Sequence, residues 1–137
     1  MEFDNNSQGV YAESVFITEC VKRRLNIYQP ILDNHGVDFI VGESDTFHKI
    51  QVKSTLRSDK RYKNSPASFK MTIGRGANSR LYDEGDFDFC CVYIIKYDVW
   101  YIIPFDEIRV RTIRVNLVGD NCKYRSYQNA WHLLTKN

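Results

Sequence analysis

The spacing of hydrophobic residues divides the chain into a helix, a run of strands and a second helical stretch. Apolar side chains recur every three or four residues over about residues 7–25, which predicts an amphipathic helix with Ser7 as its N-cap. Shorter apolar runs bounded by turn residues predict strands near residues 27–32, 36–41, 49–55, 69–73, 87–95 and 99–103, with a turn over residues 42–47. The spacing of Tyr127, Ala130, Trp131 and Leu134 predicts a C-terminal helix that covers the sheet.

One carboxylate falls on the expected apolar stripe of the first helix. Glu13 lies at helical spacing from Val10, Phe16, Ile17, Cys20 and Val21. Burying a carboxylate is costly unless it is paired or binds a cation, so Glu13 is a candidate metal ligand packed against the sheet. The alternative is that the buried stripe is shifted around the helix and leaves Glu13 at its wet margin.

Two neighbouring strands set polar side chains on one face. Side chains alternate along a strand, so Gln51 and Lys53 share a face, and Asp38 points the same way from the preceding strand. If the strands pair symmetrically about Asp45 and Thr46, Asp38 lies opposite Lys53, and Gln51 is its diagonal neighbour. A water molecule or Mg2+ fits between such groups. The arrangement suggests a metal-dependent nuclease.

The middle of the chain is strongly basic, although the whole chain has a net charge of only +2. Nine basic residues and one acidic residue lie between Lys49 and Arg80, and an acidic run follows at residues 83–88. A basic segment beside a metal site is what binding to a phosphate backbone requires. The alternative is a solvated loop whose charges only aid solubility. The candidate DNA-binding residues are Arg57, Lys60, Arg61, Lys63, Lys70, Arg75 and Arg80.

Length and composition narrow the class of protein. The 137 residues, of which 43% are hydrophobic, are enough for one globular α+β domain over residues 1–137 and argue against a disordered chain. No apolar run approaches the roughly 18–20 residues that span a bilayer, and the first residues lack a signal-peptide pattern. We therefore expect a cytoplasmic protein with no membrane partner. The four cysteines lack paired metal-ligand spacing, and we interpret them as reduced core residues.

The order of these motifs resembles a known family. Glu13 on a first helix, Gly36-Val-Asp38 on a strand, Gln51-x-Lys53-Ser54 on the next strand and an aromatic hairpin ending at Pro104 are together similar to the PD-(D/E)xK nuclease superfamily. The resemblance is closest to the small homing endonucleases associated with group I introns and covers about residues 7–134. It implies an α+β fold of the α/β/α restriction-endonuclease type, with a mixed central sheet flanked by helices. It also implies Mg2+-dependent cleavage of double-stranded DNA by a homodimer or homotetramer.

The sequence departs from the superfamily pattern at one position, where neutral Gln51 stands in place of the usual glutamate. The intron-associated enzymes resemble this chain in having that glutamine. A glutamine oxygen can coordinate a hard cation without adding charge. The resemblance therefore implies Asp38 and Glu13 as anionic ligands of Mg2+, with the Gln51 side-chain oxygen and the Val52 carbonyl as neutral ones. Lys53 would either orient and deprotonate the attacking water or stabilise the charge that develops on the phosphate.

Two other functions stay open from the sequence. A Holliday junction resolvase shares the Glu, Asp and Gln/Glu-x-Lys layout but recognises branched DNA, and a non-catalytic DNA-binding module could use the same fold. Cutting both strands of a duplex calls for two sites related by a twofold axis, which favours a closed homo-oligomer. The apolar surroundings of Trp100 and Trp131 are candidates for its interface, or else for the core.

Charge reversal tests whether the basic segment binds DNA. Reversing the charges of Arg57, Arg61 and Lys63 together should weaken binding to every duplex, because each cation that neutralises a phosphate releases a counterion. The slope of log affinity against log salt should flatten by up to about 0.9 for each lost contact. Fluorescence anisotropy at several salt concentrations measures this slope, and an unchanged slope would assign these residues to solubility alone.

Overall fold

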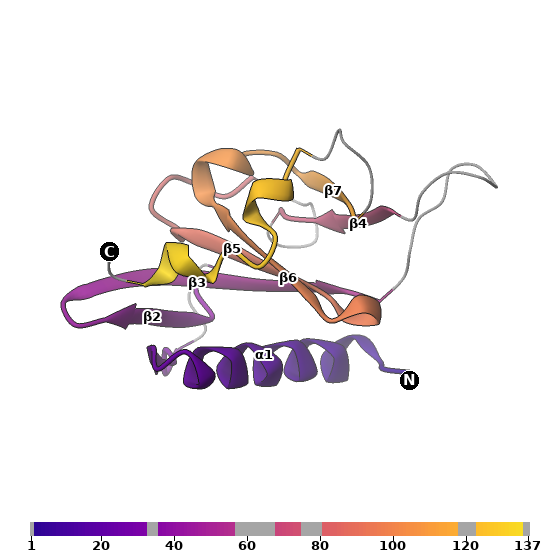
Figure 1. Ribbon diagram of the computed structural model, residues 1–137. Coiled ribbons are helices and arrows are strands. Elements are labelled where there is room, and N and C mark those ends of the chain that lie inside the picture. Colours follow the sequence, from indigo (N-terminus) through magenta and orange to yellow (C-terminus); the bar gives the residue numbers. More distant parts are fainter. Residues whose placement is uncertain (1, 33–35, 57–67, 75–80, 118–122, 136–137) are drawn as a thin grey trace.

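The chain folds into a layered α+β structure built around one mixed sheet. Figure 1 shows the computed structural model, which describes residues 2–32, 36–56, 68–74, 81–117 and 123–135. Its long elements are α1 (Asn5–Lys22), β1 (Asn26–Tyr28), β2 (Phe39–Glu43), β3 (Thr46–Thr55), β4 (Ser68–Thr72), β5 (Phe89–Ile94), β6 (Val99–Pro104) and β7 (Thr112–Asn116). Four short 3-10 helices are η1 (Ile95–Tyr97), η2 (Phe105–Glu107), η3 (Arg125–Tyr127) and η4 (Trp131–Leu134).

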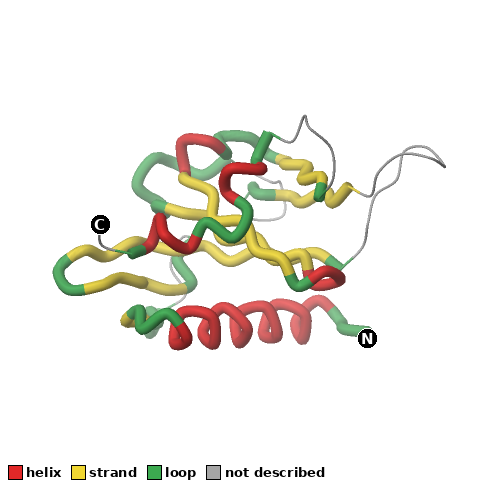
Figure 2. Tube along the Cα trace, viewed as in Figure 1, coloured by secondary structure: helices red, strands yellow, loops and turns green. Residues whose placement is uncertain are grey.

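The central sheet has the strand order β1-β2-β3-β5-β6. All neighbouring strands are antiparallel except β3 and β5, which run parallel, so the sheet is mixed, as the family resemblance implied. Helix α1 lies along one face, and β4 and β7 form a second, two-stranded sheet over the other face (Figures 1 and 2). The expected α+β fold with a mixed sheet is confirmed, although in the described part of the chain strands cover the second face, where the resemblance implied a helix.

Helix α1 starts earlier than predicted because a different residue caps it. The N-cap is Asp4, whose Oδ1 accepts a 2.7 Å hydrogen bond from the Ser7 backbone N–H, so Ser7 lies inside the first turn. Both residue types cap well, and the carboxylate upstream defines the end.

The face of α1 that packs on the sheet also differs from the expected stripe. Its buried residues are Ala12, Phe16 and Cys20, spaced by four, whereas Val10 and Val21 are 64% and 62% exposed. The stripe is shifted around the helix, and Glu13 is half-buried at its margin, which is the alternative that the sequence left open.

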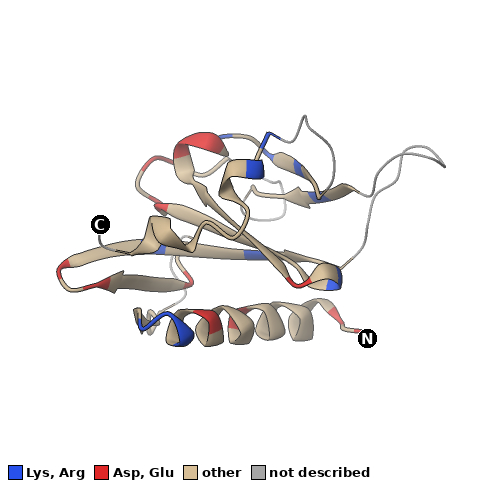
Figure 3. Ribbon diagram, in the orientation of Figure 1, with Lys and Arg blue, Asp and Glu red and all other residues tan. Residues whose placement is uncertain are grey.

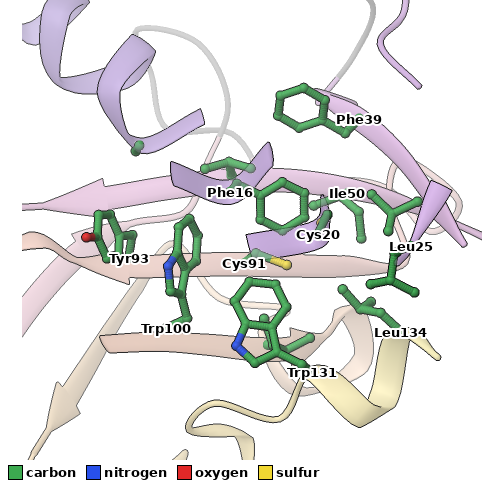
Figure 4. Close-up of a cluster of buried hydrophobic side chains, with 14 of the residues drawn as sticks. Phe16, Cys20, Leu25, Phe39, Ile50, Cys91, Tyr93, Trp100, Trp131 and Leu134 are labelled. Carbon is green, nitrogen blue, oxygen red and sulfur yellow. The ribbon is translucent and has the colours of Figure 1, made fainter. Parts of the chain in front are cut away.

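Phe16 is the centre of the core between α1 and the sheet (Figure 4). Its ring centroid lies 5.5 Å from that of Phe39, 5.6 Å from Trp100 and 5.8 Å from Trp131. Trp100 and Trp131 are almost fully buried in this cluster. Both tryptophans therefore belong to the core and are not available as an interface between subunits.

The predicted C-terminal helix is replaced by two 3-10 turns. Gln128 leaves η3 with an extended backbone, and Asn129, with a φ of +51°, turns the chain before Trp131 begins η4. The Asn129 backbone N–H donates to the Trp100 carbonyl oxygen at 2.7 Å, and its Oδ1 accepts from the Trp100 N–H at 3.3 Å. Pairing with β6 thus interrupts the helical path, while Ala130, Trp131 and Leu134 still cover the core as expected.

The register of β2 and β3 is shifted by two residues from the expected one. Phe39 pairs with Ile50 and Glu43 pairs with Thr46, so the turn consists of Ser44 and Asp45 alone. Continuing this register by one residue sets Asp38 across from Gln51 instead of Lys53. A shift of two preserves the alternation of side chains, so the prediction of a shared face survives the error.

The second face of the sheet carries its own apolar layer. Phe69 and Met71 of β4 pack with Ile113 and Val115 of β7 in one buried cluster that also contains Cys90, Val92 and Tyr101 of the central sheet. Gln51 and Lys53 are on this side of β3, since Ile50 and Val52 belong to the α1 side.

Within the described ranges, no helix is long and apolar enough to cross a membrane.

The phase of α1 can be tested with a matched pair of substitutions. Phe16→Ala should lower the free energy of unfolding by about 3–5 kcal/mol, because it leaves a cavity between three aromatic rings. Val21→Ala, on the exposed face of the same helix, should change it by no more than about 0.5 kcal/mol. Urea denaturation followed by circular dichroism measures both values, and equal losses would contradict the observed phase.

Candidate active site

Asp38 is anchored to the backbone of β3 at the entrance to β2. Its N–H donates to the Ile50 carbonyl oxygen at 2.8 Å, and its Oδ2 accepts from the Val52 N–H at 2.7 Å. A hydrogen bond to a charged acceptor contributes about 1.5–3 kcal/mol. The half-buried carboxylate is therefore held at a defined place on the sheet.

Gln51 brings an unsatisfied oxygen into the same region. It is only 8% exposed, and its Nε2 donates a long 3.4 Å hydrogen bond to the Val52 carbonyl oxygen. Its Oε1 is buried and has no hydrogen-bond partner among the residues that the structure describes. A buried acceptor without a partner costs about 1–3 kcal/mol, and such an atom is expected to serve a bound group.

Lys53 follows Gln51 on the same face of β3, beside Val92 of β5. Cys90 of β5 pairs with Gln51 across the two strands. Burial raises the pKa of the Cys90 thiol to about 12, while the charge of Lys53 lowers it and that of Asp38 raises it. The hydrogen bond from the Val52 N–H to Asp38 places Asp38 beside the same stretch of β3 that carries Gln51 and Lys53.

Glu13, on α1, borders the same cavity as Asp38. The two carboxylate residues line a cavity of about 220 Å3 together with Gln29, Pro30, Ile31, Leu32 and Val37. Gln51 and Lys53 are not in the described lining of this cavity. Asp38 is therefore the residue that links Glu13 to the polar face of β3.

The donor set fits a hard divalent cation. No three His, Cys, Asp or Glu side chains gather as a metal cluster among the described residues. An ion here would therefore depend on the carboxylates of Asp38 and Glu13 with the neutral oxygens of Gln51 and Val52. An all-oxygen set of this kind, completed by waters and phosphate, is what Mg2+ prefers. The orphaned Gln51 Oε1 is the observation that supports the fit.

Among the candidate DNA-binding residues, the structure describes Lys70 alone. The others, Arg57, Lys60, Arg61, Lys63, Arg75 and Arg80, lie outside the described residues. Lys70 is exposed on β4 and pairs with Arg114 of β7, a basic residue that the sequence reasoning missed. Figure 3 shows basic residues on both strands of this small sheet. A cluster formed across two strands 44 residues apart leaves no local signal in the sequence.

Comparisons with known proteins agree with the fold and the class of enzyme that the sequence analysis expected. A family model described as PD-(D/E)XK endonuclease matches residues 3–134. The structure is similar to that of a bacterial homing endonuclease, I-Ssp6803I, with a TM-score of 0.69 and 25% sequence identity over 96% of this chain and 93% of that chain. Hjc, a Holliday junction resolvase from the archaeal hyperthermophile Archaeoglobus fulgidus, shares the fold with a TM-score of 0.55 and 10% identity over 93% of this chain and 96% of that chain. No curated protein matches the sequence.

The raised pKa of Cys90 generates a pH dependence of stability. In the unfolded chain the thiol ionises near pH 9, whereas in the folded chain it stays protonated up to about pH 12. The stability contributed by the buried thiol is present below pH 9 and is lost as the pH rises toward 12, by up to about 1.4 kcal/mol per pH unit. The free energy of unfolding should therefore fall less steeply above pH 9 in Cys90→Ala than in the unmodified chain. Parallel slopes would place the thiol in contact with water.

Proposed function

Since the chain belongs to the PD-(D/E)XK endonuclease family, we propose that it hydrolyses phosphodiester bonds of double-stranded DNA with Mg2+, as a sequence-specific homing endonuclease. The observation that carries the proposal is a pair of hydrogen bonds: the Val52 N–H donates to Asp38 Oδ2, and Gln51 Nε2 donates to the Val52 carbonyl oxygen. Lys53 lies on the same face of β3 as Gln51. The similarity to a bacterial homing endonuclease over nearly the whole chain supports this substrate class.

Each site residue has a role that follows from its surroundings. Asp38 and Glu13 supply negative charge at the shared cavity, and Gln51 supplies a desolvated oxygen on the strand to which Asp38 is bonded. When bound, Mg2+ supplies a Lewis acid for a phosphoryl oxygen and lowers the pKa of the attacking water. The Lys53 ammonium, held on a central strand, stabilises negative charge as it develops on the phosphate.

The basic face supports a DNA partner. Lys70 and Arg114 lie on the small sheet that covers the same side of β3 as Gln51 and Lys53. Cations there would contact phosphates while a phosphodiester occupies the site, and the basic residues between β3 and β4 in the sequence would extend this contact. Each subunit has one candidate site, so we also propose a dimer or tetramer that cuts both strands.

Removal of the anchored charges tests the chemistry. Asp38→Ala and Lys53→Ala should each abolish Mg2+-dependent cleavage while leaving duplex affinity within about tenfold, a change of about 1.4 kcal/mol. Cleavage of linear duplex DNA carrying target sites and of four-way junctions, with and without Mg2+, measures the activity. Lys22→Ala is the control, because it removes an exposed cation from the last turn of α1, to which no role in the site or in DNA binding is assigned.

The outcomes of that panel separate the functions. Undiminished cutting by either alanine variant would refute the assigned site. Cleavage of junctions alone would identify a resolvase, and DNA binding without cleavage by the unmodified chain would identify a binding module.

Glu13 has a separate test because it approaches from the helix. Glu13→Gln keeps the size of the side chain but removes one anionic group from the cavity, so half-maximal cleavage should require a higher Mg2+ concentration. Glu19→Gln is the matched control, since Glu19 pairs with Lys22 and Arg23 elsewhere on α1. A wild-type Mg2+ titration for Glu13→Gln would exclude Glu13 as a ligand.

A further inference from the structure

Gly36 marks the place where another side chain approaches Gln51. A methyl group on its Cα would lie 3.2 Å from Gln51 Oε1 and 2.6 Å from Cε1 of the Tyr82 ring. The φ of Gly36 is +89°, a conformation that other residues rarely adopt. The Gln51 carboxamide and the Tyr82 ring therefore border the same small space, which the absence of a side chain at residue 36 leaves open.

The Tyr82 ring is held by the core beneath it. Its centroid lies 4.9 Å from that of Phe87 at an interplanar angle of 75°, and Phe87 packs edge-on against Phe105 at 5.1 Å. Phe87 is almost fully buried. The ring is thus one end of an aromatic row that continues into the core, although Tyr82 itself lies outside any strand.

The acidic segment, residues 82–88, is also fastened to β3. The Lys49 N–H donates to Asp88 Oδ2 at 2.8 Å, and the Asp88 N–H donates to the Lys49 carbonyl oxygen at 2.9 Å. Lys49 Nζ donates to the Gly85 carbonyl oxygen at 2.8 Å. These bonds tie the segment to β3 two residues before Gln51. They therefore limit how far the Tyr82 ring can move from the Gln51 side chain.

We propose that Tyr82 is a positioning residue for Gln51: its ring and the bare Gly36 backbone hold the carboxamide so that the buried Oε1 stays available to the metal ion. The inference rests on the proposed function for the identity of that ion. A glutamine side chain has three rotatable bonds, and an unrestrained one must lose this freedom on binding. The acidic segment that follows the basic stretch thereby acquires a role in the site.

Removal of the ring should loosen Gln51 before any metal is added. In the full-length chain, Gln51 should give one distinct pair of side-chain amide signals in a 1H–15N spectrum, assigned by their loss in Gln51→Glu. In Tyr82→Ala these signals should multiply or move to the values of a mobile glutamine. Tyr82→Phe should leave them unchanged, because the contacting atoms are ring carbons. Unaltered signals in Tyr82→Ala would overturn the positioning role.

Metal affinity supplies the second measurement. Mn2+ binding followed by electron paramagnetic resonance should weaken about 2- to 10-fold in Tyr82→Ala, the cost of ordering one flexible side chain. Tyr82→Phe should restore wild-type affinity. The matched control is Tyr127→Ala, since Tyr127 packs against the same apolar cluster from η3. Equal weakening in Tyr82→Ala and Tyr127→Ala would reduce the effect to general stability and overturn the proposal.

Two further outcomes keep the test decisive. If Tyr82→Ala fails to fold by circular dichroism, Tyr82→Leu keeps apolar volume on Phe87 while removing the flat ring, and the same changes are expected of it. A wild-type chain that binds no Mn2+ would refute the metal site of the proposed function. If the Gln51 signals of Tyr82→Ala are nevertheless those of a mobile side chain, Tyr82 positions Gln51 but has no role in metal binding.

Discussion

Strand β3 is held on both sides by hydrogen-bonded neighbours, and this constraint governs the rest of the molecule. It pairs antiparallel with β2 and parallel with β5, so its register is fixed twice. A slip of one residue would turn Gln51 and Lys53 into the core under α1 and move Ile50 and Val52 to the opposite face, where the candidate site lies. The bond from the Val52 N–H to Asp38 Oδ2 depends on the same alignment. The apolar residues under α1 and the polar residues of the candidate site therefore lie on opposite faces of β3, and one register fixes both.

Much of the fold could be read from local pattern. The hairpin of β5 and β6 and the strand β4 appear as predicted, because long apolar runs with clear turn residues have few alternatives. The predicted turn over residues 42–47 was too long, because Gly42 pairs with Phe47 in the strands and Ser44 takes the left-handed conformation in a two-residue turn. On α1, small Ala12 is buried while larger Val10 is exposed, and spacing cannot reveal which face meets the sheet.

The sequence could predict those features of the candidate site that depend on the alternation of side chains along one strand. It could not predict contacts between segments that are far apart in the sequence. Gln51 and Lys53 share a face because they are two apart on one strand, a relation that no register error disturbs. Tyr82 carried no signal, because its contact with Gly36 joins residues 46 apart and depends on a glycine that lacks a side chain. The acidic run was visible as charge, but its attachment to Lys49 required the paired strands.

The packing of Trp131 against Phe16 has a consequence for how the protein is made. Every candidate metal ligand is synthesised within the first 52 residues, yet β3 remains an open sheet edge until β5 emerges from the ribosome. Trp131, which follows β6 in the sequence, then closes the core against Phe16. Pairings between such distant residues form slowly, and an unpaired edge invites association with other chains. Synthesis therefore delays a folded nuclease domain until Trp131 has been made, and the nascent chain is exposed to aggregation during that interval.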